Sequence, residues 1–542
     1  MTREIITIQL GHYANYVGAH WWNLQEAGFS FDSSKPSEIN HDVLYREGET
    51  PRKEVTFTPR LLAVDLKGSL GYLNERGFLY DDPEDVKNPE CMWEDGKLEI
   101  TAEEPIPVAP FVQSLDKNSA SGDGKPDVTN FNFENDVTSW TEYLVPRFHP
   151  RTVNIIREYK HQCKDKPFDV FNYGFNLMKN GEFFDDFSDR IRQYAEECDS
   201  LQGFQVLMDS TDGFSGLGSA CLEYLRDEYG NSILAFPLIE GGSNEMSASN
   251  LIKVVNTALC WEKLGEHASL FSPLSCGEQG WPCPGPQRKF DNLTYDLNLK
   301  YHTSAILATA LDTLSLRYRH KEFSMSALSD LCADLNKLGR KAAATSLSLP
   351  FPMTVKNDLI DVLDDLEGPL WTSLTPSCKI IKDKSMHSLA LRGVNKDRLK
   401  RPLAEAKKQM EKPAYRCSSV HEMMTMYLAY SCHASACYLT TAEAPLNVPV
   451  PFPRIFNNNV HANGDIAGWP VAEDVKSVPV LAGLHSGSGL AFMFNSLHTQ
   501  ASRVKSIRRF HMFEESGLEQ DDFVHCLNSL LDSKESYEDN YI

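Results

Sequence analysis

The 542-residue sequence lacks the features that mark several broad classes of protein. Its 13 cysteines include no Cys-x-x-Cys pair and no histidine partner at zinc-finger spacing, which predicts unpaired thiols in a reducing compartment. The first ten residues carry Arg3 and Glu4 and only a short apolar run, so we expect neither a secretory signal nor a transit peptide. The nearest approach to a membrane span, 478–494, is too short and is interrupted by His485, serines and glycines. We therefore expect a soluble protein whose contact with any membrane is peripheral.

Basic residues are also scarce relative to acidic ones. Lys and Arg number 53 against 75 Asp and Glu, a net charge of −22, which repels nucleic acid and predicts no nucleic-acid partner. No Ser/His/Asp or Cys/His set stands out, so the sequence predicts no catalytic residues and no metal site. Hydrophobic residues make up 42% of the chain, which is enough for a folded protein of two or three domains.

Apolar runs alternate with helical patterns over the N-terminal half. Buried strands are predicted at 4–10, 60–66, 201–209 and 232–239, with amphipathic helices between them and a helix at 19–28 that places Trp21 and Trp22 in the core. Repeated strand and helix units predict an α/β fold with a parallel sheet that is covered on both faces.

Composition divides the chain into three parts. Residues 1–345 form the α/β domain, interrupted near 80–135 by an acidic, Pro-rich segment that is predicted to be a flexible insertion. Residues 346–495 form an α+β domain, and 496–542 form C-terminal helices with an acidic tail. The tail at 532–542 is interpreted as a solvated, disordered end, with recruitment of partners as the alternative.

Ligands of an open parallel sheet bind beyond the carboxyl ends of its strands. Three loops should meet at that edge here, at 11–18, 65–70 and 209–218. Gly213, Gly216 and Gly218 would let an anion approach the start of a helix, whereas Asp209 and Asp212 would oppose it.

The order of these segments resembles that of tubulins. The stretches REIITIQLGHYANYVGAHWW, TPRLLAVDLKGSL, AEECDSLQGFQV and LCADLNKLGRKAAATSLSLPFP are similar to successive tubulin segments. The variants QLGHYANYVGAHWWN, LKGSL, LQGFQVLMDSTDGFSG and SAILATALDT are similar to the misato family of tubulin-related proteins. This resemblance implies a tubulin/FtsZ-like fold, with a doubly wound parallel domain followed by an α+β domain and C-terminal helices.

The resemblance also implies a guanine-nucleotide site, for GTP or GDP, that is vestigial or weak. Its residues would be Gly11, His12, Asn15, Asp65, Ser215, Gly216, Gly218 and Asn256. Phe214 adds a bulky side chain where the backbone would have to meet a phosphate, and Lys67 replaces a glutamate that helps to organise a magnesium-bound phosphate in tubulins. Two interpretations of the glycines stay open: a tight turn kept for packing, or a weak nucleotide site with no confidently assigned cofactor.

Hydrolysis by the tubulin route requires an acidic residue three positions after an aspartate of the neighbouring subunit. Here Asp334 is followed at that spacing by Lys337, which cannot orient water as a carboxylate does. We therefore expect a protein that is not an enzyme.

Resemblance to the misato family implies a role in mitochondrial distribution, morphology and fusion. It also implies a cytoplasmic protein with peripheral contact to the mitochondrial outer membrane. One alternative is a guanine-nucleotide switch or assembling GTPase, which Asp65, Asp334 and the remaining glycines favour. The other is a cytoskeletal module that acts with tubulin or its chaperonin.

Overall fold

The computed structural model describes residues 3–30, 36–50, 53–75, 106–121, 131, 133–179, 181–245, 247–322, 326–382, 384–403 and 405–538. The insertion predicted near 80–135 lies largely outside these residues. Its described parts include helices α2 (Pro110–Ser121) and α3 (Phe133–Asp136), where the sequence predicts no regular structure.

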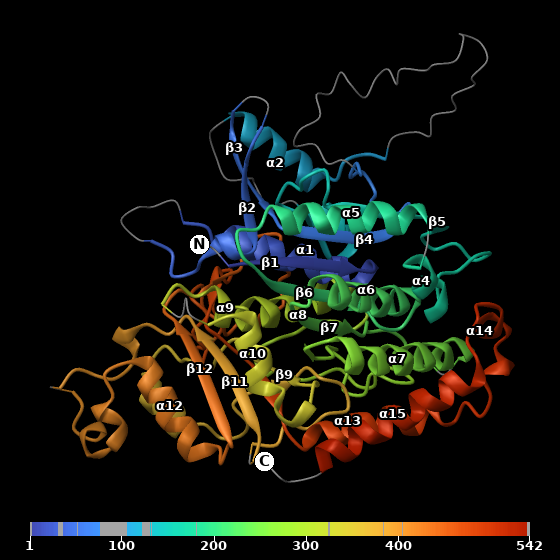
Figure 1. Ribbon diagram of the computed structural model, residues 1–542. Coiled ribbons are helices and arrows are strands. Elements are labelled where there is room, and N and C mark those ends of the chain that lie inside the picture. The colour runs from blue at the N-terminus through green and yellow to red at the C-terminus, as the bar shows by residue number, and fades with distance from the viewer. Residues whose placement is uncertain are drawn as a thin grey trace.

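Six parallel strands form the sheet of the N-terminal half (Figure 1). In spatial order they are β5 (Val153–Lys160), β4 (Leu61–Lys67), β1 (Glu4–Leu10), β6 (Leu201–Asp209), β7 (Ser232–Leu238) and β8 (Leu270–Phe271). Every residue of β1 is buried, as expected for a strand with two neighbours and two covered faces. The predicted parallel sheet is therefore confirmed, and β1 and β6 have the predicted bounds.

Helices cover both faces of this sheet and enclose a separate core on each. One face carries α1 (His12–Ala27) and α8 (Lys300–Leu314), and the other carries α4 (Phe171–Leu177), α5 (Glu182–Glu196), α6 (Gly213–Tyr229) and α7 (Ala248–His267). Trp21 and Trp22 stack with ring centroids 5.4 Å apart and are 1% and 0% exposed, which confirms their predicted place in the core.

A second, mixed sheet forms the domain that follows. Its strands, in spatial order, are β10 (Thr372–Ser373), β9 (Ala344–Ser348), β15 (Val480–Ser486), β11 (Met386–Arg392) and β12 (Ala436–Ala442). β11 and β12 are parallel and the other neighbours are antiparallel. Helix α12 (Val420–Ser431) packs beside β12, so the predicted α+β character is confirmed. α8 contacts both α1 and β15, and thus lies between the two sheets.

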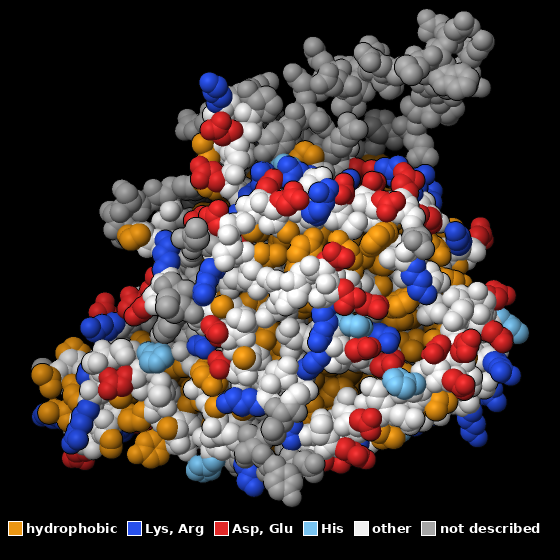
Figure 2. Space-filling view, in the orientation of Figure 1, with side chains coloured by type: hydrophobic (Ala, Val, Ile, Leu, Met, Phe, Trp, Pro, Cys, Tyr) orange, Lys and Arg blue, Asp and Glu red, His pale blue; other side chains and the backbone are white. Residues whose placement is uncertain are grey.

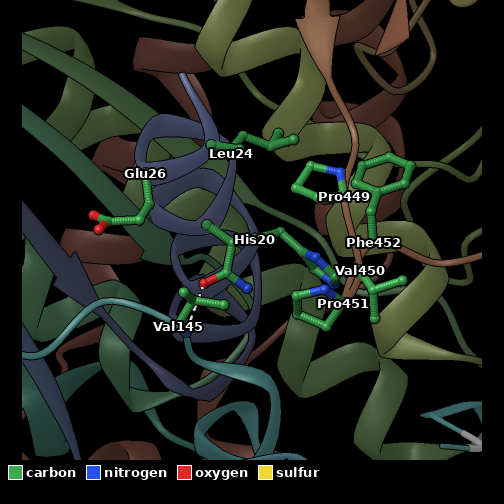
Figure 3. Close-up of a pocket in the computed structure, with 10 residues that line it drawn as sticks. His20, Leu24, Glu26, Val145, Pro449, Val450, Pro451 and Phe452 are labelled. Carbon is green, nitrogen blue, oxygen red and sulfur yellow. Dashed lines mark hydrogen bonds between the residues drawn. The ribbon is translucent and has the colours of Figure 1, made fainter. Parts of the chain in front are cut away.

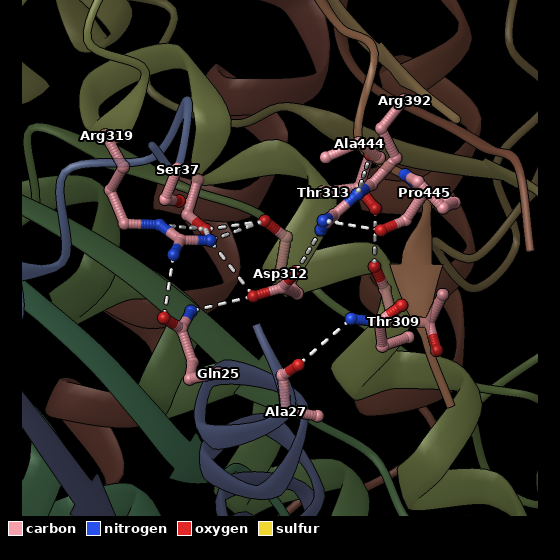
Figure 4. Close-up of polar contacts among 12 residues, drawn as sticks. Gln25, Ala27, Ser37, Thr309, Asp312, Thr313, Arg319, Arg392, Ala444 and Pro445 are labelled. Carbon is pink, nitrogen blue, oxygen red and sulfur yellow. Dashed lines mark hydrogen bonds and ion pairs between the residues drawn. The ribbon is translucent and has the colours of Figure 1, made fainter. Parts of the chain in front are cut away.

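A buried ion cluster fixes the end of α8 to both domains (Figure 4). Asp312 Oδ1 lies 3.0 Å from Arg319 Nη2, and Asp312 Oδ2 lies 2.5 Å from Arg392 Nη1. Gln25 Nε2 on α1 donates to the same carboxylate at 2.7 Å. All four side chains are buried. Because Gln25 belongs to the first domain and Arg392 to β11, this cluster links the two sheets through α8.

The C-terminal helices α13 (Gly489–Ala501), α14 (His511–Glu515) and α15 (Gln520–Glu538) follow the second sheet, as predicted. α13 and α15 pack on each other and on α7. The prediction of a disordered tail from residue 532 is wrong up to Glu538, because α15 continues there and Tyr537 is buried. The Tyr537 hydroxyl donates to the Ala342 carbonyl at 2.7 Å and accepts the Ala342 N–H at 2.9 Å. Residues 539–542 lie outside the described part.

The remaining elements are short. They are the hairpin β2 (Tyr45–Glu49) and β3 (Val55–Pro59), the pair β13 (Leu446–Asn447) and β14 (Ser477–Val478), and helices α9 (Leu316–Arg319), α10 (Leu328–Leu335) and α11 (Leu359–Asp364). Within the described ranges, none of the helices combines the length and apolar character needed to cross a membrane. On the face shown in Figure 2, acidic and basic side chains are interspersed rather than gathered into one basic surface.

Candidate functional site

The segments that follow β1, β4 and β6 meet at the carboxyl edge of the six-stranded sheet, as predicted. The prediction that 11–18 and 209–218 are loops is wrong in part, because α1 begins at His12 and α6 begins at Gly213. β1 lies between β4 and β6, so the residues that follow these three strands are neighbours. The Gly11 N–H, directly after β1, donates to the Val64 carbonyl of β4 at 3.1 Å. The edge is therefore a compact surface from which the N-termini of α1 and α6 begin.

The N-terminus of α1 is already capped by a carboxylate of the protein itself. Asp209, the last residue of β6, accepts the backbone N–H of Tyr13 at 2.9 Å and that of Ala14 at 2.8 Å. Gly11 makes this approach possible, because its φ is +118° and a Cβ there would lie 2.4 Å from Asp209 Oδ2. The Tyr13 hydroxyl donates to Thr303 Oγ1 of α8 at 2.9 Å, which makes Tyr13 a packing residue. The N–H groups that could hold a phosphate thus hold Asp209.

A second carboxylate caps α6. Asp212 Oδ1 accepts the Phe214 N–H at 2.9 Å, and the Asp212 carbonyl accepts the N–H of Ser215 at 3.1 Å. Burial raises the pKa of Asp209 well above its usual range, and the nearby Asp212 raises it further, although the two N–H bonds act in the opposite direction. Burial likewise raises the pKa of Asp212, against the Phe214 N–H bond that lowers it. Two carboxyl groups therefore share a region where a further anion would be repelled.

The glycines of the β6–α6 segment serve close packing. A Cβ on Gly216 would lie 1.8 Å from the carbonyl oxygen of Phe171, and one on Gly174 of α4 would lie equally close to the backbone of α6. A Cβ on Gly218 would lie 2.2 Å from Met208 Cε. These contacts let α4 and β6 approach α6 at backbone distance. They support the packing interpretation of the glycine pattern.

Phe214 does not occupy the position that the sequence analysis assigned to it. Its side chain is 2% exposed and packs edge to face against Phe168, with ring centroids 5.0 Å apart. The prediction that its bulk stands where a phosphate would lie is therefore wrong. The side chain turns into the core because the first turn of α6 faces the sheet. Only the Phe214 backbone N–H remains at the edge, where it donates to Asp212 Oδ1.

Both polar atoms of the Asn256 side chain, on α7, form hydrogen bonds within the protein. Its Oδ1 accepts the Phe171 N–H at 3.0 Å, and its Nδ2 donates to the carbonyls of Asp169 and Thr211 at 2.7 and 3.0 Å. The side chain thus fastens the loop before α4 to the loop before α6. Contact with a nucleotide would require these hydrogen bonds to break.

Asp65 gathers three polar side chains at the end of β4. His12 Nδ1 lies 3.3 Å from Asp65 Oδ2, and the same oxygen accepts Asn15 Nδ2 at 3.2 Å and Trp140 Nε1 at 3.0 Å. Burial alone would raise the pKa of Asp65, but the interactions with His12, with the Leu66 N–H and with Trp140 outweigh it, and the pKa is lowered. Asp65 is therefore held as a carboxylate.

His161, which was not predicted from the sequence, completes this cluster. Its ring lies 4.2 Å, centroid to centroid, from that of His12, and one nitrogen or oxygen from each of His12, Asp65 and His161 lies within 4.8 Å of the others. Burial, followed by the neighbouring His12, lowers the pKa of His161 to about 4. The only sequence signal was its place directly after β5, a strand that was not predicted. These residues offer three possible ligands for a metal ion.

The two lysines near this edge do not create a phosphate-binding site. Lys67, which follows Asp65, has an exposed side chain. Lys300 Nζ, at the start of α8, pairs with Glu240 at 3.2 Å and lies 6.0 Å from the centre of the Tyr16 ring. Lys300 is therefore neutralised by a further carboxylate.

The residues implicated in hydrolysis lie elsewhere. Asp334 on α10 pairs with Arg317 at 3.0 Å, and Lys337 is exposed in the turn that follows. Asp334 is therefore salt-bridged, and an exposed lysine follows it at the spacing where the resemblance to tubulins implies an acidic residue.

A separate small cavity lies between α1 and residues 449–452 (Figure 3). It has a volume of about 130 Å³ and includes His20 and Phe452 in its lining. His20 Nε2 lies 3.0 Å from the Tyr301 carbonyl, and burial lowers the pKa of His20 to about 3. This histidine therefore stays neutral and stabilises packing between α1 and α8.

Taken together, the side chains at the sheet edge do not fit a nucleoside triphosphate. The predicted residues Gly11, His12, Asn15 and Asp65 do come together around the start of α1. Ser215, Gly216, Gly218 and Asn256, however, are engaged in capping, packing and loop fastening. Both helix N-termini already hold carboxyl groups of the protein, so a triphosphate would find these N–H donors engaged.

Comparison with known proteins gives similarity over nearly the whole chain. Residues 3–117 match the family model described as the Misato Segment II tubulin-like domain, and residues 131–320 match that of the Tubulin domain. The chain is 34% identical to Protein misato of Drosophila melanogaster over 99% of each chain. It is 35% identical to Protein misato homolog 1 of Bos taurus, over 99% of this chain and 98% of that protein. Protein dml1 of Aspergillus oryzae is 31% identical over 59% of this chain and 62% of its own length.

Proposed function

This chain belongs to the misato family of tubulin-like proteins, and we propose that it is a non-enzymatic member that regulates mitochondrial distribution, morphology and fusion. The observation that carries the non-enzymatic part is the pair of hydrogen bonds from the start of α1 to Asp209. A protein carboxylate occupies the donors that a bound nucleotide would need. Lys337 supports the same conclusion, because it cannot orient a water molecule for attack.

The mitochondrial part of the proposal rests on resemblance to misato proteins. The protein would act from the cytoplasm, with peripheral attachment to the mitochondrial outer membrane. Tubulin or its chaperonin are the candidate protein partners, since the fold is that of tubulins. Pull-down of the tagged chain from cell extract, followed by immunoblotting for both, would test these partners. Failure to recover either would remove them from the proposal.

Nucleotide content tests the non-enzymatic part directly. The full chain, purified gently and without added nucleotide, would be denatured and its released small molecules identified by mass spectrometry. We expect no stoichiometric GTP or GDP and no phosphate release when GTP is added at high protein concentration. Stoichiometric GTP or GDP in the purified protein, or phosphate release from added GTP, would favour the alternative, a guanine-nucleotide switch or assembling GTPase.

Depletion and rescue test the cellular part. Loss of the protein should change the shape and spread of the mitochondrial network, and the wild-type chain should restore both. The variant Asp209→Ala, which removes the cap on α1, should restore the network less well than the wild type. The shortfall should match the reduced amount of folded protein. An unchanged network after depletion would contradict the mitochondrial role, whatever the nucleotide measurement gives.

A further inference from the structure

Two histidines and an aspartate from three adjoining elements face one another at the sheet edge. His12 opens α1, Asp65 lies near the end of β4, and His161 directly follows β5. One ligand atom from each lies within 4.8 Å of the other two. β4 pairs with both β1 and β5, so the three backbone positions are fixed by the sheet.

Other groups hold this triad in place. The Asp65 carboxylate is oriented by Asn15 Nδ2 and Trp140 Nε1, and Asn15 Nδ2 is itself fixed by the Val64 carbonyl at 3.0 Å. The His161 backbone N–H donates to the Lys67 carbonyl at 2.9 Å. Asn15 and Trp140 both donate to Oδ2, the oxygen that faces His12, and so they hold the carboxylate beside the imidazole. Neither the nucleotide interpretation nor the packing of α1 explains why Asp65 and both imidazoles converge.

We propose that His12, Asp65 and His161 bind one divalent transition-metal ion of the Zn²⁺ class. Two imidazole nitrogens and one carboxylate oxygen are ligands that zinc and its neighbours in the first transition series accept, whereas Mg²⁺ and Ca²⁺ prefer all-oxygen sites. Three protein ligands leave at least one coordination position for water or another small ligand. On binding, any proton on the imidazole nitrogen that faces the metal is released to solvent.

The geometry requires only a small adjustment. Ligand atoms around tetrahedral zinc lie about 3.3 Å apart, since each metal–ligand bond is about 2 Å. His12 Nδ1 and Asp65 Oδ2 already have that separation, at 3.3 Å. His161 is partly exposed, so its ring is free to close the remaining gap by rotation about its side-chain bonds.

The charges around the triad are mixed. Lys300 pairs with Glu240 at 3.2 Å and also acts on His161 and Asp212, whereas Asp65 is the carboxylate that would balance part of a cation's charge. This site is independent of the proposed function, because metal binding and the mitochondrial role can each fail without the other.

Zinc titration of the untagged full chain tests the proposal. After treatment with a chelator, the protein would compete with a chromogenic zinc indicator, alone and in the presence of excess Mg²⁺. We expect one Zn²⁺ per chain, no competition by Mg²⁺, and at least a tenfold weaker affinity for His161→Asn. His511→Asn, which changes an exposed histidine on α14, is the matched control and should bind as the wild type does.

Cobalt distinguishes this site from adventitious binding by thiols such as the exposed Cys437. Co²⁺ in the wild type should give visible bands of a nitrogen and oxygen site without the intense near-ultraviolet bands of thiolate ligands. If His161→Asn is less stable without metal, this wild-type spectrum and its loss on adding Zn²⁺ decide the matter. Equal zinc affinity in wild type and a folded His161→Asn variant, or a thiolate spectrum, would overturn the proposal.

Discussion

Gly11 and Asp209 fit together only because Gly11 has no side chain: a Cβ would lie 2.4 Å from the Asp209 carboxylate that caps α1. The two residues are far apart in sequence, and they join β1, α1 and β6 at one point. The same contact decides what the sheet edge can bind, since it uses the donors at the start of α1. Stability and ligand selectivity are therefore set by one interaction.

Replacing Gly11 by alanine should lower the free energy of unfolding by about 2–3 kcal/mol, from the unfavourable positive φ and the displaced cap. Urea denaturation of the purified chain would measure the change. Gly242→Ala is the control, because Gly242 has open space around its Cα and no positive φ, and it should change stability little. Equal effects of the two substitutions would show that the close contact at Gly11 is unimportant.

Gly216→Ala tests whether the glycine pattern serves packing. Alanine is usually favoured over glycine in a helix by about 1 kcal/mol, yet here its Cβ would meet the Phe171 carbonyl. We expect a net loss of about 2 kcal/mol or more, as in other overpacked sites. Gly265→Ala in α7, where nothing lies within 4 Å, should instead stabilise the protein by about 0.5–1 kcal/mol. A stabilising Gly216→Ala substitution would contradict the packing role.

Asp312→Asn should destabilise the protein strongly, because two buried guanidinium groups lose their shared counter-charge. Breaking a buried ion pair costs about 3–5 kcal/mol, which thermal and urea unfolding would detect. The exposed pair of Asp474 and Arg454 provides the comparison, and Asp474→Asn should leave the midpoint unchanged. Similar midpoints for the two variants would mean that the cluster does not hold the domains together.

Acid should weaken the fold through His20. Its pKa is about 3 in the folded protein, against about 6.5 unfolded, so the unfolded chain binds the proton more readily. The stabilising contribution of neutral His20 to the free energy of unfolding is complete above about pH 6.5. It falls by about 1.4 kcal/mol per pH unit as the pH drops toward 3. The free energy of unfolding, measured by urea denaturation at several pH values in this range, should change less steeply with pH in His20→Gln than in the wild type.

The exposed His511 on α14 supplies the matched His→Gln control for that measurement. Only the difference between the slopes is assigned to His20, because other buried histidines such as His485 also have a lowered pKa. Identical slopes for His20→Gln and wild type would contradict the assignment.

Much of the fold was predictable because its central strands are continuous apolar runs. β1 and β6 are buried along almost their whole length, so composition alone marks them. β5 lies at the sheet edge and carries exposed Arg157 and Glu158, which hide the pattern. His161 was missed with it, and the metal-ligand triad could not be recognised.

The site was predictable only in position. The sequence predicts Gly11, His12 and Asp65 at the sheet edge, but it shows Asp209 there only as a charge that opposes phosphate. Its contact with the start of α1 spans 196 positions, and no local pattern reveals such a partner. The orientation of Phe214 was misjudged for a similar reason, since its packing partner Phe168 lies in another loop.

Tyr537 holds both backbone groups of Ala342, the residue that leads from the first sheet into β9 of the second. Through these two hydrogen bonds, the last described turn of the chain fixes the segment that connects the two domains. A premature stop codon that removes Tyr537 would remove both hydrogen bonds and a buried side chain. Such a truncation would therefore lower the stability of the protein as a substitution in the core does.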